Sequence, residues 1–173
     1  MLDNFKEIFL DKYSDDRGYF QETYNFDIKY KIGCDFVQDN ESFSKKGVVR
    51  GLHYQWDEPM GKLVRCSYGK IIDVIVDVRK DSKNLGKVYY FELSSEKSNA
   101  LWVPPGFAHG FDTLSDFALV SYKCTSLYNK EGESGIDPFD LDLNIKWAGK
   151  NIIVSEKDKT AKSFEDYLSD PKF

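Results

Sequence analysis

The sequence predicts an all-β protein, a jelly-roll β-barrel with a short helical segment near its C-terminus. Three observations support this class. Short stretches of alternating or β-branched residues recur along the chain, turn signals separate them, and aromatic residues make up 16% of the composition. Tyr and Phe, which account for most of these aromatics, favour strands. Many short strands joined by regular turns are typical of an antiparallel sandwich or barrel.

The strand signals follow one another in a simple order. In residues 36–44 the two-residue alternation places Gln38, Asn40 and Ser42 on one side. Further strands are predicted at residues 50–55, 69–80, 87–94, 100–104 and 117–128. Stretches such as "YGK", "KDSKNLGK" and "PPGFAHG" mark turns between them. A helix is expected only over residues 155–168, where a Ser cap opens a run with spaced apolar residues.

The stretch "GKIIDVIVDVRK" (69–80) carries apolar residues on both of its faces. One face is uniformly apolar and is expected to enter a core; it consists of Ile72, Val74, Val76 and Val78. The other face mixes apolar and charged residues, namely Ile71, Asp73, Ile75, Asp77 and Arg79. Charged groups are not buried dry, so this second face either lines a polar cavity inside a barrel or faces solvent.

Length and charge narrow the class further. The 173 residues suit one domain, spanning 1–173, that is large enough for a hydrophobic core. The net charge is −5 and no basic block occurs, so no nucleic-acid partner is expected. No apolar run is long enough for a membrane span, and the acidic N-terminal stretch does not resemble a signal peptide. Three separate cysteines form no disulfide framework, which predicts a reduced, cytoplasmic protein.

The stretch "RGLHYQ" (50–55) holds His53, one of only two histidines in the chain. A lone histidine is more often a hydrogen-bonded core residue than a catalytic group. Two features favour a function here. Arg50, Lys62 and Arg65 lie nearby in sequence and could collect an anion. The second histidine, His109, lies in "PPGFAHGF", which is interpreted as a Pro/Gly loop of the kind that positions functional groups.

The sequence lacks the usual motifs of metal-dependent catalysis, nucleophilic catalysis and phosphate-loop binding. There is no H-x-H pair and no H-E-x-x-H, so no metal is predicted. There is no G-x-S-x-G and no glycine-rich phosphate loop, and Cys66 and Cys124 lie in apolar stretches where buried thiols are expected. Acid–base chemistry without a cofactor remains. It needs a base such as His53, an acid such as Tyr122 or Tyr128, and an acidic residue to orient the imidazole. Either tyrosine could equally be an ordinary strand aromatic, and the residues alone do not single out one of the 29 acids.

Six stretches taken together resemble one known family, in the order in which that family has them. They are "DDRGYFQE" (15–22), "QDNESFSKKGVVRGLHYQ" (38–55), "GKLVRC" (61–66), "VDVRKDS" (76–82), "PPGFAHGF" (104–111) and "YKCTSLYNKEGESGI" (122–136). They resemble the dTDP-4-dehydrorhamnose 3,5-epimerases, the RmlC-like branch of the cupin superfamily. The resemblance runs from about residue 5 to residue 168. It implies a cupin-like jelly roll, a homodimer, no metal or cofactor, and a nucleotide-linked 4-keto-6-deoxyhexose substrate for deoxysugar and cell-surface polysaccharide biosynthesis.

The resemblance also implies roles for individual residues. His53 matches the general base, Tyr122 the proton donor on the opposite face of the sugar, and Asp158 the acid that pairs with the histidine. Positions that reach the nucleotide from the partner subunit are matched by Arg17, Phe20 and Glu22. Tyr128 matches an aromatic that stacks on the base. Further substrate contacts are implied for Gln38, Asn40, Arg50, Lys62, His109, Glu133 and Lys157.

Two departures from the family pattern keep alternatives open. Met60 stands where family members commonly have Gln, and residues 135–147 lack the first Trp of the usual stretch. One alternative is a C3-only epimerase or a ketoisomerase that uses the same base on a related dTDP-, GDP- or CDP-linked sugar. The other is a cupin module that binds a sugar nucleotide without turnover. Proton exchange at individual sugar carbons distinguishes these alternatives.

Overall fold

A computed structural model of the protein describes residues 4–149 and 151–173. The strands are β1 (Lys6–Phe9), β2 (Lys12–Asp15), β3 (Gly18–Gln21), β4 (Gln38–Lys45), β5 (Val49–Gln55), β6 (Lys62–Tyr68), β7 (Lys70–Asp77), β8 (Val88–Ser94), β9 (Asn99–Val103), β10 (Phe107–Thr113), β11 (Phe117–Cys124) and β12 (Glu133–Gly135). The helices are α1 (Phe26–Ile32), α2 (Glu156–Lys159) and α3 (Phe164–Ser169). None of the helices in the described ranges is long and apolar enough to cross a membrane.

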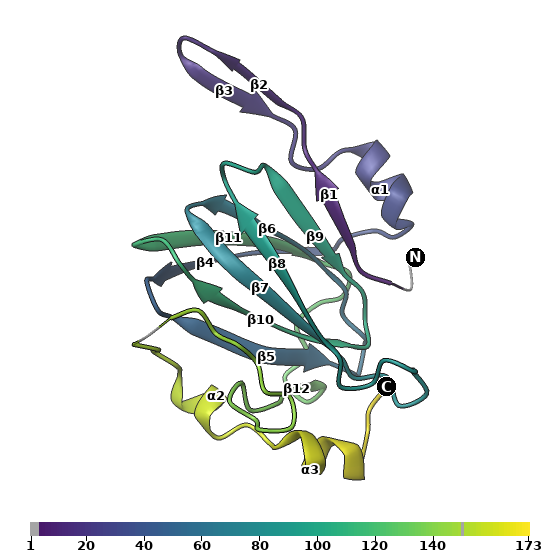
Figure 1. The fold of residues 1–173 in the computed structure, drawn as a ribbon. Coiled ribbons are helices and arrows are strands. Elements are labelled where there is room, and N and C mark those ends of the chain that lie inside the picture. Colours follow the sequence, from purple (N-terminus) through teal and green to yellow (C-terminus); the bar gives the residue numbers. More distant parts are fainter. Residues whose placement is uncertain (1–3, 150) are drawn as a thin grey trace.

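Two five-stranded antiparallel sheets face each other in this fold (Figure 1). One has the strand order β1-β9-β6-β11-β4 and the other β12-β5-β10-β7-β8. Except for β7 and β8, strands that neighbour each other in these two sheets are not consecutive in sequence, as in a jelly roll. The predicted fold class is therefore confirmed. Strands β2 and β3 form a separate hairpin that projects away from the body at the opposite end from β5 and β12 (Figure 1).

The side chains between the two sheets form a mainly apolar core. Its members come from both sheets and include Val64, Cys66, Ile71, Ile75, Leu93, Leu101, Phe107, Phe111, Ala118 and Val120. Burying this apolar surface is the main favourable contribution to folding. Polar residues occupy part of the same interior, and they form the site described below.

Strand β7 shows why the stretch 69–80 is apolar on both faces. Its outer face, with Val74 and Val76, packs against the C-terminal segment, where Phe164 and Tyr167 cover it. The inner face, with Ile71 and Ile75, enters the core between the sheets. Asp73 shares that inner face and is fully buried. Of the two interpretations left open for the charged face, the polar interior is therefore the one that applies to Asp73.

The helix prediction was incomplete at both ends of the chain. Residues 155–168 form two short helices and not one, because Ser155 and Ser163 each cap a separate helix. Helix α1 was not predicted, although its signals are present. Asn25 caps its N-terminus by accepting a hydrogen bond from the Ile28 backbone N–H, and Gly33 ends it with a φ of 75°.

The interpretation of "PPGFAHGF" as a loop was wrong. Residues 107–113 form strand β10, which pairs with β5 on one side and β7 on the other. The glycine at position 110 serves a close approach of two strands. A Cβ at Gly110 would come within 2.5 Å of the Arg50 carbonyl oxygen, and one at Gly51 within 2.6 Å of the Gly110 Cα. Only the beginning of the stretch is a turn, and His109 is buried in the sheet.

Candidate active site

His53 lies on β5 with its imidazole bound to a carboxylate from the C-terminal segment. The His53 Nε2 is 2.7 Å from Asp158 Oδ1. The His53 side chain is 29% exposed, whereas that of Asp158 is only 5% exposed. Asp158 lies in α2, where the Ser155 cap fixes the helix start, and its Oδ2 also accepts a hydrogen bond from the Gly51 backbone N–H. The predicted pairing of these two residues is thus present in the fold, across 105 residues of sequence.

The pKa of Asp158 reflects its surroundings. Burial raises it, but the hydrogen bond and charge of His53 and the backbone N–H of Gly51 outweigh burial, so the pKa lies below its ordinary value. Asp158 is therefore a carboxylate at neutral pH. Because it holds the Nε2 edge of His53, the Nδ1 edge is left for a substrate. This arrangement is that of an oriented general base.

Tyr122 and Lys62 face this histidine from the opposite sheet, on the neighbouring strands β11 and β6. The Lys62 Nζ lies 5.9 Å from the centre of the Tyr122 ring. Burial raises the pKa of Tyr122 and lowers that of Lys62. The Tyr122 phenol therefore keeps its proton and can donate it. The Lys62 ammonium is a poorly solvated charge whose environment favours an anionic partner.

A small cavity of about 80 Å³ lies between the two sheets at this point. Ten residues line it: Gln38, Asn40, His53, Tyr54, Gln55, Met60, Lys62, Tyr122, Tyr128 and Glu133. Seven of these, all except Tyr54, Gln55 and Met60, were predicted as site residues. The fold therefore gathers into one cavity side chains that are up to 95 positions apart, because β4, β5, β6, β11 and β12 meet there.

At the rim of this cavity, Glu133 joins two other predicted residues. Its Oε2 accepts hydrogen bonds from the Tyr128 hydroxyl at 3.0 Å and the Lys157 ammonium at 2.6 Å. Burial raises the pKa of Glu133, but these two donors outweigh it and hold the pKa below its ordinary value. Gln38 closes the rim, since its side-chain oxygen accepts a hydrogen bond from the Tyr128 backbone N–H at 3.0 Å.

His109 and Asp73 form a second histidine–aspartate pair, deeper in the interior. His109 is the register partner of His53 across β10 and β5, so their side chains share the inner face. The His109 Nε2 is 2.8 Å from Asp73 Oδ2. Burial raises the pKa of Asp73, and its neighbours His109 and Lys62 only partly oppose this.

Other predicted residues lie elsewhere in the chain. Arg17 is on the hairpin turn and pairs with Asp15, Phe20 is 64% exposed on β3, and Glu22 accepts a hydrogen bond from Asn25. The structure does not bring these three to His53 within one chain. Arg50 is bound to Ser44 and to the Phe43 carbonyl oxygen on β4.

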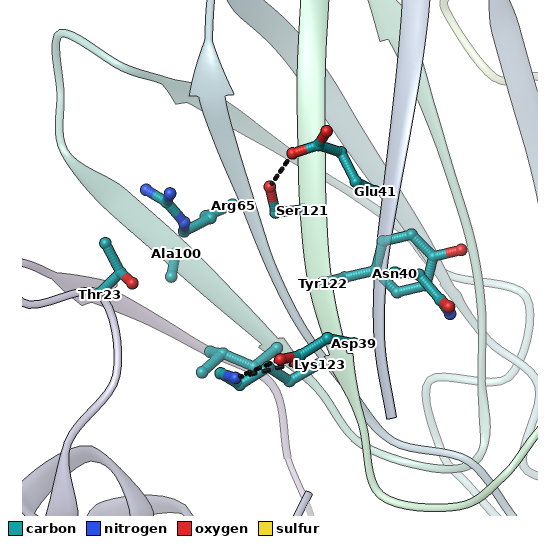
Figure 2. A pocket seen from close by; sticks show the side chains of 10 residues that line it. Thr23, Asp39, Asn40, Glu41, Arg65, Ala100, Ser121, Tyr122 and Lys123 are labelled. Carbon is teal, nitrogen blue, oxygen red and sulfur yellow. Dashed lines mark hydrogen bonds and ion pairs between the residues drawn. The ribbon is translucent and has the colours of Figure 1, made fainter. Parts of the chain in front are cut away.

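Arg65 lies on the wrong side of the sheet to serve the site with Lys62. Alternation along β6 turns Arg65 outward, where it lines a hollow of about 430 Å³ on the outer side of the sheet, together with Thr23, Asp39, Glu41, Ser121 and Lys123. Figure 2 shows the Tyr122 ring and Asn40 on the opposite side of the strands from Arg65. The suggestion that Arg50, Lys62 and Arg65 jointly collect one anion is therefore wrong for Arg65.

Sequence reasoning missed three residues that shape the site. Asp73 was placed on the correct face but not paired with His109. Cys124 lies within reach of the Asn40 side-chain amide, at 3.6 Å. Gln55 is buried, and its amide group binds the Glu58 and Leu127 carbonyl oxygens and the Asn129 backbone N–H. Gln55 thus fixes the segment that carries Tyr128, and its position two residues after His53 on one strand face was the available signal.

The fold and the site together define a cupin-type barrel in which a histidine and a tyrosine from the two sheets line one interior cavity. The family model for dTDP-4-dehydrorhamnose 3,5-epimerase matches residues 1–166. The dTDP-4-dehydrorhamnose 3,5-epimerase of Methanothermobacter thermautotrophicus is 48% identical over 159 residues, which cover 89% of this chain and 86% of that protein. The chain belongs to the dTDP-4-dehydrorhamnose 3,5-epimerase family.

Solved structures agree with this assignment. The Legionella pneumophila epimerase in complex with dTDP-4-keto-L-rhamnose is 42% identical, with a TM-score of 0.89, covering 94% of this chain and 88% of that chain. A 3'-monoepimerase from Streptomyces bikiniensis in complex with dTDP-quinovose also has a TM-score of 0.89 but is 28% identical, covering 95% of this chain and 86% of that one. The fold is therefore shared by enzymes that differ in the number of carbons they invert.

Proposed function

We propose that this protein is a dTDP-4-dehydrorhamnose 3,5-epimerase that inverts C3 and C5 of the sugar by proton transfer. The observation that carries the proposal is the placement of an aspartate-held His53 on one sheet and a protonated Tyr122 on the facing sheet, with a cavity between them. An inversion requires a base and an acid on opposite faces of one carbon, and this geometry provides both.

The first step is removal of a proton next to the C4 ketone. The ketone acidifies the C–H bonds at C3 and C5, because the resulting carbanion is delocalised onto the C4 oxygen as an enolate. His53 takes this proton on Nδ1, while Asp158 holds Nε2 and stabilises the imidazolium that forms. The Lys62 ammonium, which lines the same cavity, stabilises the negative charge on the enolate oxygen.

The second step returns a proton to the other face of the same carbon. Tyr122 gives its phenolic proton to the carbanion, so the C–H bond forms opposite to the one that broke, and the C4 ketone is restored. Tyr122 then regains a proton from solvent and His53 loses one. Binding by Gln38, Asn40, Arg50, His109, Tyr128, Glu133 and Lys157 would hold the sugar and its diphosphate during both inversions.

A homodimer belongs to the same proposal. Arg17, Phe20 and Glu22 lie on or directly after a hairpin that projects away from the body (Figure 1). Isolated two-stranded hairpins are only marginally stable alone, so this hairpin favours a partner surface. Exposed aromatic residues also occur at the end of strands β4, β11 and β6. There the Phe117 ring stacks on Tyr68, with ring centres 5.3 Å apart, and lies tilted against Phe43, with ring centres 5.8 Å apart. The hairpin of one copy would reach the nucleotide end of the other copy's cavity. A cytoplasmic location remains a prediction from the cysteines.

The activity is tested by proton exchange in D2O with dTDP-4-keto-6-deoxyglucose, followed by NMR. We expect deuterium at C3 and C5 with the natural chain. We expect a loss of about 100-fold or more with His53→Gln, since a general base commonly contributes about 100-fold to 10⁴-fold. Retained binding of dTDP by His53→Gln, measured by calorimetry, is the control for folding.

Three other outcomes would contradict the proposal. Exchange at C3 alone would assign the protein to the monoepimerases. Tight binding without exchange would assign it to the sugar-nucleotide-binding modules. Full activity of His53→Gln would remove His53 from the mechanism.

The hairpin exchange is tested separately by co-expression of two variants, Arg17→Ala and His53→Gln, each with its own tag. If the hairpin serves the partner's site, the purified mixed dimer contains one intact site and regains activity that neither variant shows alone. A mixed dimer without recovered activity would contradict the exchange, and a monomer in light scattering would contradict the dimer.

A further inference from the structure

A sealed carboxylate inside the barrel has no role in the proposed two-step reaction. Asp73 lies on the inner face of β7 with none of its side-chain surface exposed. Its Oδ2 contacts the His109 Nε2 at 2.8 Å, but its Oδ1 is buried without a hydrogen-bond partner in the part of the chain that the structure describes. Buried unpaired polar atoms are rare in folded proteins and destabilise them, so this one calls for an explanation.

The surroundings of Asp73 are those of the candidate site. His109 shares the inner face with its register partner His53, so the Asp73–His109 pair continues the row of side chains that begins at the base. His109 contacts Asp73 through Nε2, so its Nδ1 edge has no hydrogen-bond partner among the described residues. The same is true of His53, whose Nε2 contacts Asp158. Lys62, which is partly buried, interacts electrostatically with Asp73 from the opposite sheet.

We propose that Asp73 is a positioning residue of the reaction, which fixes the imidazole of His109 on the inner face beside His53. The inference rests on the proposed function for its catalytic meaning. Asp73 orients His109 by accepting a hydrogen bond from its Nε2–H, so Nδ1 faces the space next to His53. In its ionised form, Asp73 also interacts with the Lys62 ammonium, and such interactions are strong in a low-dielectric interior. Both effects favour hydrogen bonding of Lys62 and His109 to an oxygen of the sugar.

Several charged and titratable groups surround Asp73 and Lys62, and the test must take them into account. Those that interact with Lys62 or Asp73 are Cys66 on β6, Glu133 on β12, Cys124 on β11, Lys157 on α2 and His109 on β10. Tyr122 adds its ring, and His53 lies beside His109. Of the carboxylates in this set, Asp73 is sealed from solvent, whereas Glu133 is already bound to Lys157. Glu133 acts on Lys62 more strongly than Asp73 does, but of these two carboxylates only Asp73 also contacts His109.

The test uses the isosteric variant Asp73→Asn. We expect kcat to fall about tenfold or more, with KM changed much less, since losing one stabilising donor at a developing oxyanion commonly lowers kcat by about 100-fold or more. The alkaline limb of the kcat–pH profile should move to lower pH, because Lys62 loses its proton more easily without the carboxylate. The melting temperature should stay equal or rise, because an unpaired buried charge has been removed.

Asp77→Asn is the matched control. Asp77 is on the same strand and buried, but its carboxylate is bound by Arg79 Nη2 at 2.6 Å and Ser82 Oγ at 2.7 Å. This substitution should lower the melting temperature and leave the pH profile unchanged. If Asp73→Asn behaves like Asp77→Asn, with lost stability and an unshifted profile, Asp73 is merely structural and the proposal is wrong.

A second measurement does not depend on turnover. Nitrogen-15 NMR of the histidine rings should show the Nε2-protonated form of His109 in the natural chain, and its loss or change in Asp73→Asn. Carbon-13 NMR of lysine should show Lys62 titrating at lower pH in the variant. A His109 protonated on Nδ1, or a Lys62 titration unaffected by Asp73→Asn, would overturn the inference even if the protein acts on another substrate. Failure of the natural chain to exchange protons would affect only the proposed function.

Discussion

The two histidine–aspartate pairs of this protein have the same contact in different surroundings. In each, a carboxylate oxygen meets the histidine Nε2, at 2.7 Å for His53–Asp158 and 2.8 Å for His109–Asp73. The first histidine is 29% exposed at the cavity and the second only 9% exposed. The contact alone therefore does not define the role of either pair.

The difference lies in what else surrounds each carboxylate. Asp158 receives the His53 ring and a backbone N–H, and its pKa lies below the ordinary value although burial opposes this. Asp73 receives the His109 ring only, one of its oxygens is unpaired, and burial raises its pKa. A carboxylate with hydrogen-bond partners on both oxygens suits the permanent orientation of a base. A buried carboxylate with one unpaired oxygen destabilises the fold, which implies that Asp73 contributes through its effect on neighbouring groups.

The largest expected effect is on kcat, and it should distinguish the His53–Asp158 pair from the His109–Asp73 pair. Asp158→Asn should lower kcat by about 100-fold or more, because His53 loses both its orientation and the charge that stabilises its protonated form. Steady-state kinetics with the dTDP-linked sugar would measure it. Glu156→Gln is the matched control, since it removes an exposed carboxylate from the same helix and should change kcat little. If Asp158→Asn lowered kcat less than Asp73→Asn does, the His109–Asp73 pair would be the more important one for the reaction, contrary to this prediction.

The sequence predicts much of this fold because its strands alternate regularly. What it did not predict depends on contacts between distant segments. The Val face of β7 was assigned correctly to a core, but only the C-terminal segment, packed on it through Phe164, explains why both faces of the strand are buried. His109 was placed in a loop because Gly110 was read as a turn residue. That glycine instead permits the approach of β5 and β10.

The site was predicted unevenly for a similar reason. Chemistry pointed to His53 as the base, since few histidines occur, but it left Tyr122 and Tyr128 as alternative proton donors, and the family resemblance chose Tyr122. The acid could not be chosen among 29 carboxylates, because the contact between His53 and Asp158 spans 105 positions. Asp158 entered through the family resemblance alone. The polar face that holds Asp73 was visible in the alternation, but its partner lies on a strand that was not predicted.

A medium effect concerns stability, and here the two aspartates should have opposite pH dependence. The folded-state pKa of Asp158 is lowered, so its stabilising contribution is present above the ordinary carboxyl pKa and is lost as pH falls through the folded-state value. The folded-state pKa of Asp73 is raised, so its contribution is present below the ordinary pKa and is lost as pH rises through the folded-state value.

Urea unfolding of Asp158→Asn and Asp73→Asn beside the natural chain, from roughly pH 3 to pH 8, measures both slopes. Relative to the natural chain, Asp158→Asn should lose about 1–3 kcal/mol of unfolding free energy at neutral pH and less in acid, as expected for a hydrogen bond to a charged group. The unfolding free energy of Asp73→Asn, relative to that of the natural chain, should increase as pH rises. Parallel slopes for the two variants would show that the carboxylates experience the same environment and would remove the distinction between the pairs.

The smallest effect is expected at the rim, where the Glu133–Lys157 pair offers a partly solvated contrast to both buried pairs. The Lys157 side chain is 60% exposed, so its ion pair with Glu133 should contribute less than about 1 kcal/mol to stability and weaken with salt. Lys157→Ala should therefore unfold almost like the natural chain in urea. Lys159→Ala, which breaks an exposed pair on the same helix, is the control. If Lys157 contacts the substrate, its variant alone should raise KM, most strongly at low ionic strength. A large loss of stability in Lys157→Ala would instead show that the Glu133–Lys157 ion pair mainly stabilises the fold and does not mainly bind a ligand.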